Sequence, residues 1–182
     1  ASFLGGVPGV KTLIYFSDTL EMTPGRDLLR VIQERCPGRP ETQQYNLPDT
    51  MNRDFLAMTR SANANRVTFY AIQPQGLRSD FMSTAGARGA RLFTGTAQIT
   101  GAIRESERSG MSFVAAQTGG EAIFNKNSFR EDFVRIGQEM TSYYSLAYEP
   151  PHGGDRGDHQ IKVRIKGKDS LKVRHRRGYR DK

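Results

Sequence analysis

The chain has 182 residues, of which 36% are hydrophobic and 25% are charged, and this composition favours one globular domain with long loops. Its apolar runs are far too short to cross a bilayer and no targeting segment is visible, so we expect no membrane span. A single cysteine, Cys36, excludes an internal disulfide and a site built from several thiolates. The net charge of +8 is uneven, because residues 153–182 carry +7 of it.

The first half of the chain predicts strands that alternate with helices. Residues 11–18 form a short, β-rich apolar run, which is typical of a buried strand. Apolar side chains recur at helical spacing over residues 28–36 and again over residues 55–62, with a proline-rich loop over residues 37–49 between them. Residues 66–72 predict a second buried strand.

The alternation continues after a break. Residues 74–100 show no clean period, and we expect a long irregular excursion there. A third helix is predicted over residues 101–117, and Gly119 or Gly120 would supply its left-handed cap. Residues 121–125 predict a short third strand.

A fourth helix has the clearest signals in the chain. Ser128 and Glu131 have the spacing of a capping box, in which the serine side chain accepts a free backbone N–H and the glutamate reaches back to the N–H of the serine. The apolar residues behind them lie on one stripe at helical spacing: Phe129, Phe133, Ile136 and Met140. We therefore expect a helix that buries this stripe.

The pattern changes near the C-terminus. Residues 143–148 predict a strand. Residues 161–165 and 171–174 alternate apolar with basic side chains, which indicates two half-buried strands joined by a turn over residues 167–170. We therefore expect an antiparallel hairpin as an extension of the main body.

Together these elements predict an α/β fold. Strands that alternate with helices imply a parallel, partly Rossmann-like sheet with helices on both faces. We place this body in residues 1–142, and the β extension with its basic hairpin in residues 143–182.

Asp18 is the most interesting single residue, because it stands where the first predicted strand ends. In open α/β sheets, ligands bind beyond the C-terminal ends of the strands. A carboxylate there, flanked by Ser17 and Thr19 as candidate binding residues, could hold a hard cation such as Mg²⁺ through oxygen. The same position also suits a turn residue or a helix cap.

Several local phrases occur in an informative order and spacing. They are Thr-Leu-Ile-Tyr-Phe-Ser-Asp at 12–18, Asn-Arg-Val-Thr-Phe-Tyr-Ala-Ile at 65–72, Ala-Ala-Gln-Thr-Gly-Gly-Glu-Ala-Ile-Phe at 115–124, Ser-Tyr-Tyr-Ser-Leu-Ala-Tyr-Glu-Pro-Pro at 142–151 and Lys-Val-Arg-His-Arg-Arg-Gly-Tyr at 172–179. This series resembles the C-terminal part of von Willebrand factor type A domains, in particular a related bacterial subgroup abundant in soil Acidobacteria. The resemblance covers nearly the whole chain except residues 74–100.

The resemblance implies a divalent-cation site that this chain largely lacks. Such domains hold the ion through an Asp-x-Ser-x-Ser phrase, a later Thr and an Asp after the fourth strand, and only the last maps here, to Asp18. Thr19 stands where the family usually has Gly. Because Mg²⁺ needs several fixed oxygens, we expect Mg²⁺ or Mn²⁺ in a complete domain and none on this chain alone.

The resemblance also implies that the first three strands of the domain precede this sequence. Residues 12–17 would then present an unpaired apolar edge, which invites pairing with another strand. An upstream segment or a second copy of the chain would complete the sheet.

Protein–protein or cell-surface binding without catalysis is the function that the resemblance implies. It also implies export from a Gram-negative bacterium, so the chain would be secreted, periplasmic or located at the cell surface. A nucleophile elbow, a Cys/His arrangement and a phosphate-binding loop are all missing from the sequence, which favours a non-enzymatic protein.

The basic hairpin supports an alternative function. Its candidate binding residues are Arg164, Lys172, Arg174 and Arg176, which could contact nucleic acid or another anion. Alternating charges are also typical of a solvated strand face, and few aromatic residues are present for base stacking. A protein is therefore the favoured partner and nucleic acid the less favoured one.

Overall fold

A computed structural model gives the structure of the chain, and it describes residues 2–25, 32, 50–76, 94–149, 157–168, 170–171 and 173–180. The loop predicted over residues 37–49 lies outside the described residues, as does the helix predicted over residues 28–36 apart from Ile32. Residues 77–93 of the excursion and Lys172 also lie outside them.

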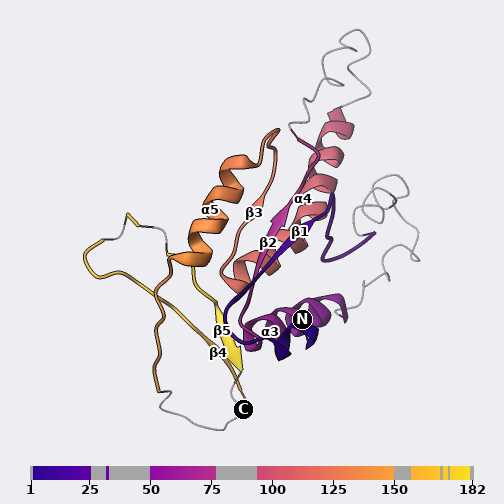
Figure 1. Ribbon diagram of the computed structural model, residues 1–182. Coiled ribbons are helices and arrows are strands. Elements are labelled where there is room, and N and C mark those ends of the chain that lie inside the picture. Colours follow the sequence, from indigo (N-terminus) through magenta and orange to yellow (C-terminus); the bar gives the residue numbers. More distant parts are fainter. Residues whose placement is uncertain are drawn as a thin grey trace.

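The described elements follow the predicted alternation of strands and helices (Figure 1). In chain order they are η1 (Ser2–Gly6), β1 (Lys11–Phe16), α3 (Thr50–Ala64), β2 (Val67–Ile72), α4 (Thr94–Thr118), β3 (Ala122–Ile123), α5 (Arg130–Thr141), β4 (Asp158–Gln160) and β5 (Gly178–Arg180). The first three strands form a parallel sheet in the order β1-β2-β3, and β4 pairs with β5 in a separate antiparallel sheet. The predicted α/β class is therefore confirmed.

β2 is the central strand and carries the core on both of its faces. Phe69 and Ala71 point to one face, where they pack with Phe55 of α3 and with Met111 and Val114 of α4. On the other face, Tyr70 and Ile72 pack with Ile123 of β3 and Ile136 of α5. Helices cover both faces of the sheet as predicted, with α3 and α4 on one side and α5 on the other.

The end of α4 is joined closely to β2. The buried Thr118 hydroxyl donates to the Val114 carbonyl within the helix and accepts the Phe69 N–H at 3.0 Å, so one side chain links helix to strand. Gly119 follows with φ of +81°, the left-handed conformation predicted for the cap. Three residues, 119–121, thus lead from α4 into β3.

The segment after β1 packs backbone to backbone against α4. The Leu20 N–H donates to the Glu107 carbonyl, and the Gly110 N–H donates to the Leu20 carbonyl, both at 2.8 Å. A Cβ atom at Gly110 would lie 2.2 Å from the Leu20 oxygen and 2.9 Å from the Phe55 ring. Only glycine fits this helix position, because the contact between α4 and the segment after β1 leaves no room for a side chain.

Two predicted helix starts are wrong. α4 begins at Thr94, within the stretch predicted as irregular, and not at residue 101. α5 begins at Arg130 after an N-cap at Phe129 without a side-chain hydrogen bond, so Ser128 forms no capping box. The helix dipole is met instead by Asp132 in the first turn, a buried carboxylate held by Lys126 and Arg135.

The strands and the apolar stripe are less buried than predicted. β1 is an edge strand that buries only part of its side chains, and β3 is two residues long. In α5, Ile136 is buried, but Phe133 and Met140 are exposed. Ile136 packs on β2 and β3, whereas Phe133 stacks on Phe16 at the outer edge of β1, where none of the described strands lies farther out to cover it.

The C-terminal extension differs most from the prediction. Residues 143–149 have no regular structure and are exposed, so the predicted strand there is wrong. The hairpin exists, but its ladder joins residues 158–160 to 178–180 at the base. Farther out, the Val163 N–H bonds to the His175 ring nitrogen, which takes the place of a backbone acceptor and interrupts the ladder.

We predict that Gly110→Ala lowers the free energy of unfolding by about 1–3 kcal/mol, because its methyl group overpacks the contact with Leu20. Gly137→Ala in α5 is the matched control, since a Cβ there meets no atom within 4 Å. It should raise stability by about 0.5–1 kcal/mol, the usual gain from replacing an interior helical glycine. Urea denaturation of both variants checks the pair, and equal effects would contradict the close packing at Gly110.

Candidate functional site at the edge of the sheet

The outer edge of β1 is unpaired among the described residues, because β1 is hydrogen-bonded only to β2. The Lys11 N–H donates to the Arg66 carbonyl at 2.9 Å, and the Ser17 N–H donates to the Ile72 carbonyl at 3.2 Å. Alternate residues of a parallel strand bond to the same neighbour. The backbone groups of the intervening residues, Thr12, Ile14 and Phe16, therefore point away from β2.

An apolar patch adjoins this edge on the α5 face of the sheet. It consists of Ile14, Phe16 and Phe133, whose exposed fractions are 37%, 52% and 42%. The rings of Phe16 and Phe133 stack with their centroids 6.0 Å apart. We call these three residues the β1 patch. Backbone donors and acceptors and an apolar surface thus lie side by side.

The turn after β1 contains the predicted site residues Ser17, Asp18 and Thr19. The Ser17 hydroxyl donates to the Thr19 carbonyl at 2.8 Å, and the Thr19 N–H points back to the same hydroxyl at 3.4 Å. The Asp18 carbonyl accepts from the amide of Gln73 at 2.7 Å. The Asp18 side chain is exposed, and its carboxylate has no partner within the described part of the chain. The alternative prediction, that Asp18 is a turn residue, therefore accounts for all of its described contacts.

A fixed cation, Arg108 of α4, lies at the C-terminal ends of the neighbouring strands. Its Nε donates to Gln73 after β2 at 3.0 Å, and its Nη2 donates to Asn125 after β3 at 2.7 Å. The guanidinium also lies 5.0 Å from the centre of the Phe124 ring. Sequence reasoning missed these residues, although the rule that selected Asp18 also selects Gln73 and Asn125, which each follow a strand.

The described residues at this edge offer few oxygen ligands for a divalent cation. No cluster of three or more His, Cys, Asp or Glu side chains suited to a metal occurs among the residues that the structure describes. Asp18 contributes one carboxylate, and the Ser17 hydroxyl is engaged in its own turn. These groups are too few for Mg²⁺, so its binding in a more complete domain remains a prediction.

Arg174, one of the predicted anion-binding residues, is paired inside the protein. Its guanidinium donates to Glu121 at 2.7 Å and also to Glu139, which accepts from the Tyr70 hydroxyl as well. Burial is the main cause of a raised pKa for the Tyr70 hydroxyl. The cluster joins the C-terminal arm to β2, β3 and α5.

Arg176 fastens the same arm to the opposite side of the body. It donates to the Asn63 carbonyl in the last turn of α3 at 3.0 Å, where a cation complements the helix dipole. Burial, followed by the nearby charge of Arg66, lowers the pKa of the Arg176 guanidinium. Of the other two hairpin residues, Arg164 is exposed and Lys172 lies outside the described residues.

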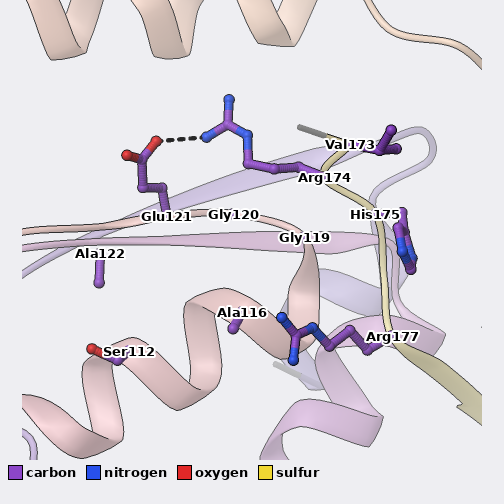
Figure 2. Close-up of a pocket in the computed structure, with 10 residues that line it drawn as sticks. All are labelled: Ser112, Ala116, Gly119, Gly120, Glu121, Ala122, Val173, Arg174, His175 and Arg177. Atoms are coloured by element: carbon purple, nitrogen blue, oxygen red, sulfur yellow. Dashed lines mark hydrogen bonds and ion pairs between the residues drawn. The ribbon is translucent and has the colours of Figure 1, made fainter. Parts of the chain in front are cut away.

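A pocket of about 320 Å³ lies between the arm and the end of α4 (Figure 2). Its lining includes Gly119, Glu121, Arg174, His175 and Arg177. Arg174 faces Glu121 across it, and the Arg177 side chain extends toward the helix. The backbone N–H of Arg177 donates to the backbone carbonyl of Gln117 at 3.2 Å. The pocket is therefore the joint by which the arm docks.

Comparison with protein-family models, with curated proteins and with solved structures found no match to this chain. None of the helices in the described part of the chain is long and apolar enough to span a membrane.

We predict that calorimetric titration with Mg²⁺ or Mn²⁺ gives no micromolar binding to this chain, and that Asp18→Ala changes nothing, because one carboxylate cannot replace the water shell of the ion. Micromolar binding that Asp18→Ala abolishes would contradict this expectation and would require further oxygen ligands.

Replacing Arg174 tests the docking of the arm. Arg174→Met should lower the free energy of unfolding by about 1.5–3 kcal/mol, since it leaves Glu121 and Glu139 without this charged donor. Arg164→Met removes an exposed arginine from the same arm and should change stability by less than about 0.5 kcal/mol. Urea denaturation measures both. A similar loss in the two variants would show that the ion-pair cluster does not hold the arm.

Proposed function

We propose that this chain is a non-enzymatic protein-binding module that receives an extended apolar segment along the outer edge of β1. The observation that carries the proposal is the unpaired edge at Thr12, Ile14 and Phe16 beside the β1 patch. An open strand edge is a template for a further strand, and strand addition is a common mode of peptide recognition.

The edge supplies both affinity and selectivity. The outward N–H and C=O groups of Thr12, Ile14 and Phe16 can pair with the backbone of any added strand. The β1 patch, in contrast, selects apolar side chains on one face of that strand. The two ends of the edge have opposite charges, Lys11 and Asp18, so a partner with complementary charges is favoured.

For the type of module, we keep the family that the sequence resembles. We propose a von Willebrand factor type A domain, supported by the quoted phrases and by the parallel order β1-β2-β3. In that type further strands lie beyond β1, so the added segment would come from a longer protein, from a second copy or from a separate partner. Cation assistance from Mg²⁺ or Mn²⁺ and a secreted, periplasmic or cell-surface location belong to the same proposal.

The internal use of two hairpin arginines favours this proposal over binding of nucleic acid by the whole hairpin. Arg174 and Arg176 are engaged with carboxylates and with a helix end, so they are less available to an external anion.

The test uses a labelled synthetic peptide of alternating threonine and valine, as long as β1, with Glu at its N-terminus and Lys at its C-terminus. Ile14→Pro removes an outward N–H and leaves the β1–β2 ladder intact, because proline is tolerated on a strand edge that faces solvent. We expect the chain to bind the peptide and Ile14→Pro to bind it at least about tenfold more weakly.

Leu13→Pro is the matched control for the backbone, since its N–H faces β2 and its loss should destabilise the sheet. Phe16→Ser reduces the β1 patch without a backbone change and should also weaken peptide binding. Sedimentation velocity separates the sources: self-association that Ile14→Pro abolishes identifies a second copy as the occupant. Equal peptide binding by the wild type, Ile14→Pro and Phe16→Ser would refute the proposal.

A further inference from the structure

The arm between β4 and β5 is an amphipathic hairpin. Its register pairs Asp158 with Arg180, so odd-numbered residues of the two limbs share one face and even-numbered residues share the other. The odd face carries Ile161, Val163 and Ile165, and the even face carries a row of cations. The arm extends away from the sheet on the side of α5 (Figure 1).

The apolar face of the arm becomes uncovered toward its tip. Ile161, Val163 and Val173 are half buried, whereas Ile165 and Leu171 beside the turn are 42% and 52% exposed. The turn itself is closed by hydrogen bonds from the Lys168 N–H to the Ile165 carbonyl and from the Leu171 N–H to the Lys168 carbonyl. Ile165 and Leu171 are thus exposed to solvent beside a hydrogen-bonded turn.

Four cations lie close to these two aliphatic residues along the chain. Lys162, Arg164, Lys166 and Lys168 are all exposed, and their side chains have no hydrogen-bond or ion-pair partner within the described residues. In the sequence from residue 161 to residue 177, Asp169 is the only acidic residue. By the same register, Lys162 is level with Arg176 and Arg164 with Arg174 across the arm. The contacts of Arg174 and Arg176 with the body come from the second limb, so the four cations of the first limb and turn take no part in them.

A second exposed segment adds aromatic side chains near the base of the arm. Residues 143–149 have no regular structure, and Tyr144 is 98% exposed, with Tyr143 and Leu146 also exposed. Tyr148 in this segment contacts Tyr179 of β5 with ring centroids 6.0 Å apart, which ties the segment to the arm. Tyrosine is the residue type that favours the boundary between water and lipid.

We infer that the first limb and the turn of the arm, through residues 162–168, 170 and 171, bind the surface of a membrane that contains anionic lipids. Ile165 and Leu171 enter the boundary between headgroups and acyl chains, and the cations contact the headgroup phosphates. Charge complementarity selects this occupant, and the exposed aliphatic side chains favour lipid over nucleic acid, which offers bases for stacking and no apolar phase. This inference is independent of strand addition at β1.

Vesicle sedimentation tests the inference with the whole chain. The probes are vesicles of phosphatidylcholine and vesicles of equal parts phosphatidylcholine and phosphatidylglycerol. We expect binding to the anionic vesicles only, and at least about tenfold weaker binding for Arg164→Gln/Lys166→Gln, since each cation near such a surface contributes several-fold in affinity. Ile165→Ser/Leu171→Ser should weaken the binding as well, including the part that resists added salt.

The matched control is Arg53→Gln/Arg130→Gln, which removes the same charge from exposed positions on α3 and α5. It should bind the anionic vesicles as the wild type does, and Ile14→Pro should too. Equal weakening in the control and the arginine–lysine tip variant would overturn the inference, because net charge alone would then explain binding. Tighter binding to a single-stranded oligonucleotide, unaffected by Ile165→Ser/Leu171→Ser, would overturn it in favour of nucleic acid.

Discussion

β2 is the strand on which the rest of the structure depends, because it is paired on both edges and covered on both faces. Its residues alternate between a core with α3 and α4 and a core with α5, and Ala71 and Ile72 are fully buried. A strand with neither a free edge nor a free face is expected to be mostly apolar, and β2 is so apart from Thr68 and the Tyr70 hydroxyl. The joint at Thr118 and Gly119 and the contact at Gly110 then fix α4 against the sheet.

β1 is the candidate binding strand because, unlike β2, it is not enclosed on both edges and both faces. Within the described part of the chain, β1 has one paired edge and one free edge, and α5 leaves Ile14 and Phe16 uncovered. Burial of this patch by an added strand would remove apolar surface from water and satisfy backbone groups at the same time. The fixed cation Arg108 and the exposed carboxylate of Asp18 lie beyond the strand ends, where they add charge near that surface.

The basic tail divides into two parts with different physical roles. On the second limb of the arm, Arg174 and Arg176 neutralise carboxylates and complement the end of α3, so their charge is used within the fold. On the first limb and at the turn, the side chains of four exposed cations have no partner among the described residues, and two exposed aliphatic residues lie beside the turn. Net charge by itself cannot separate these roles, because both parts have the same alternating pattern.

Local pattern in the sequence determined the class of fold, the parallel order of strands and helices, and a left-handed glycine at 119 or 120, since each depends on residues close together in the chain. It placed Asp18 at a strand end but could not identify Arg108, Gln73 and Asn125 as one cluster. It also predicted that Ser128 caps α5, whereas the first-turn carboxylate of Asp132 complements the helix dipole. It predicted a strand over residues 143–148, which pair with no strand in the described part of the chain. Only the tertiary structure decided which edge stays open, which arginines are paired and which apolar residues remain exposed, because these properties depend on contacts between segments far apart in the sequence.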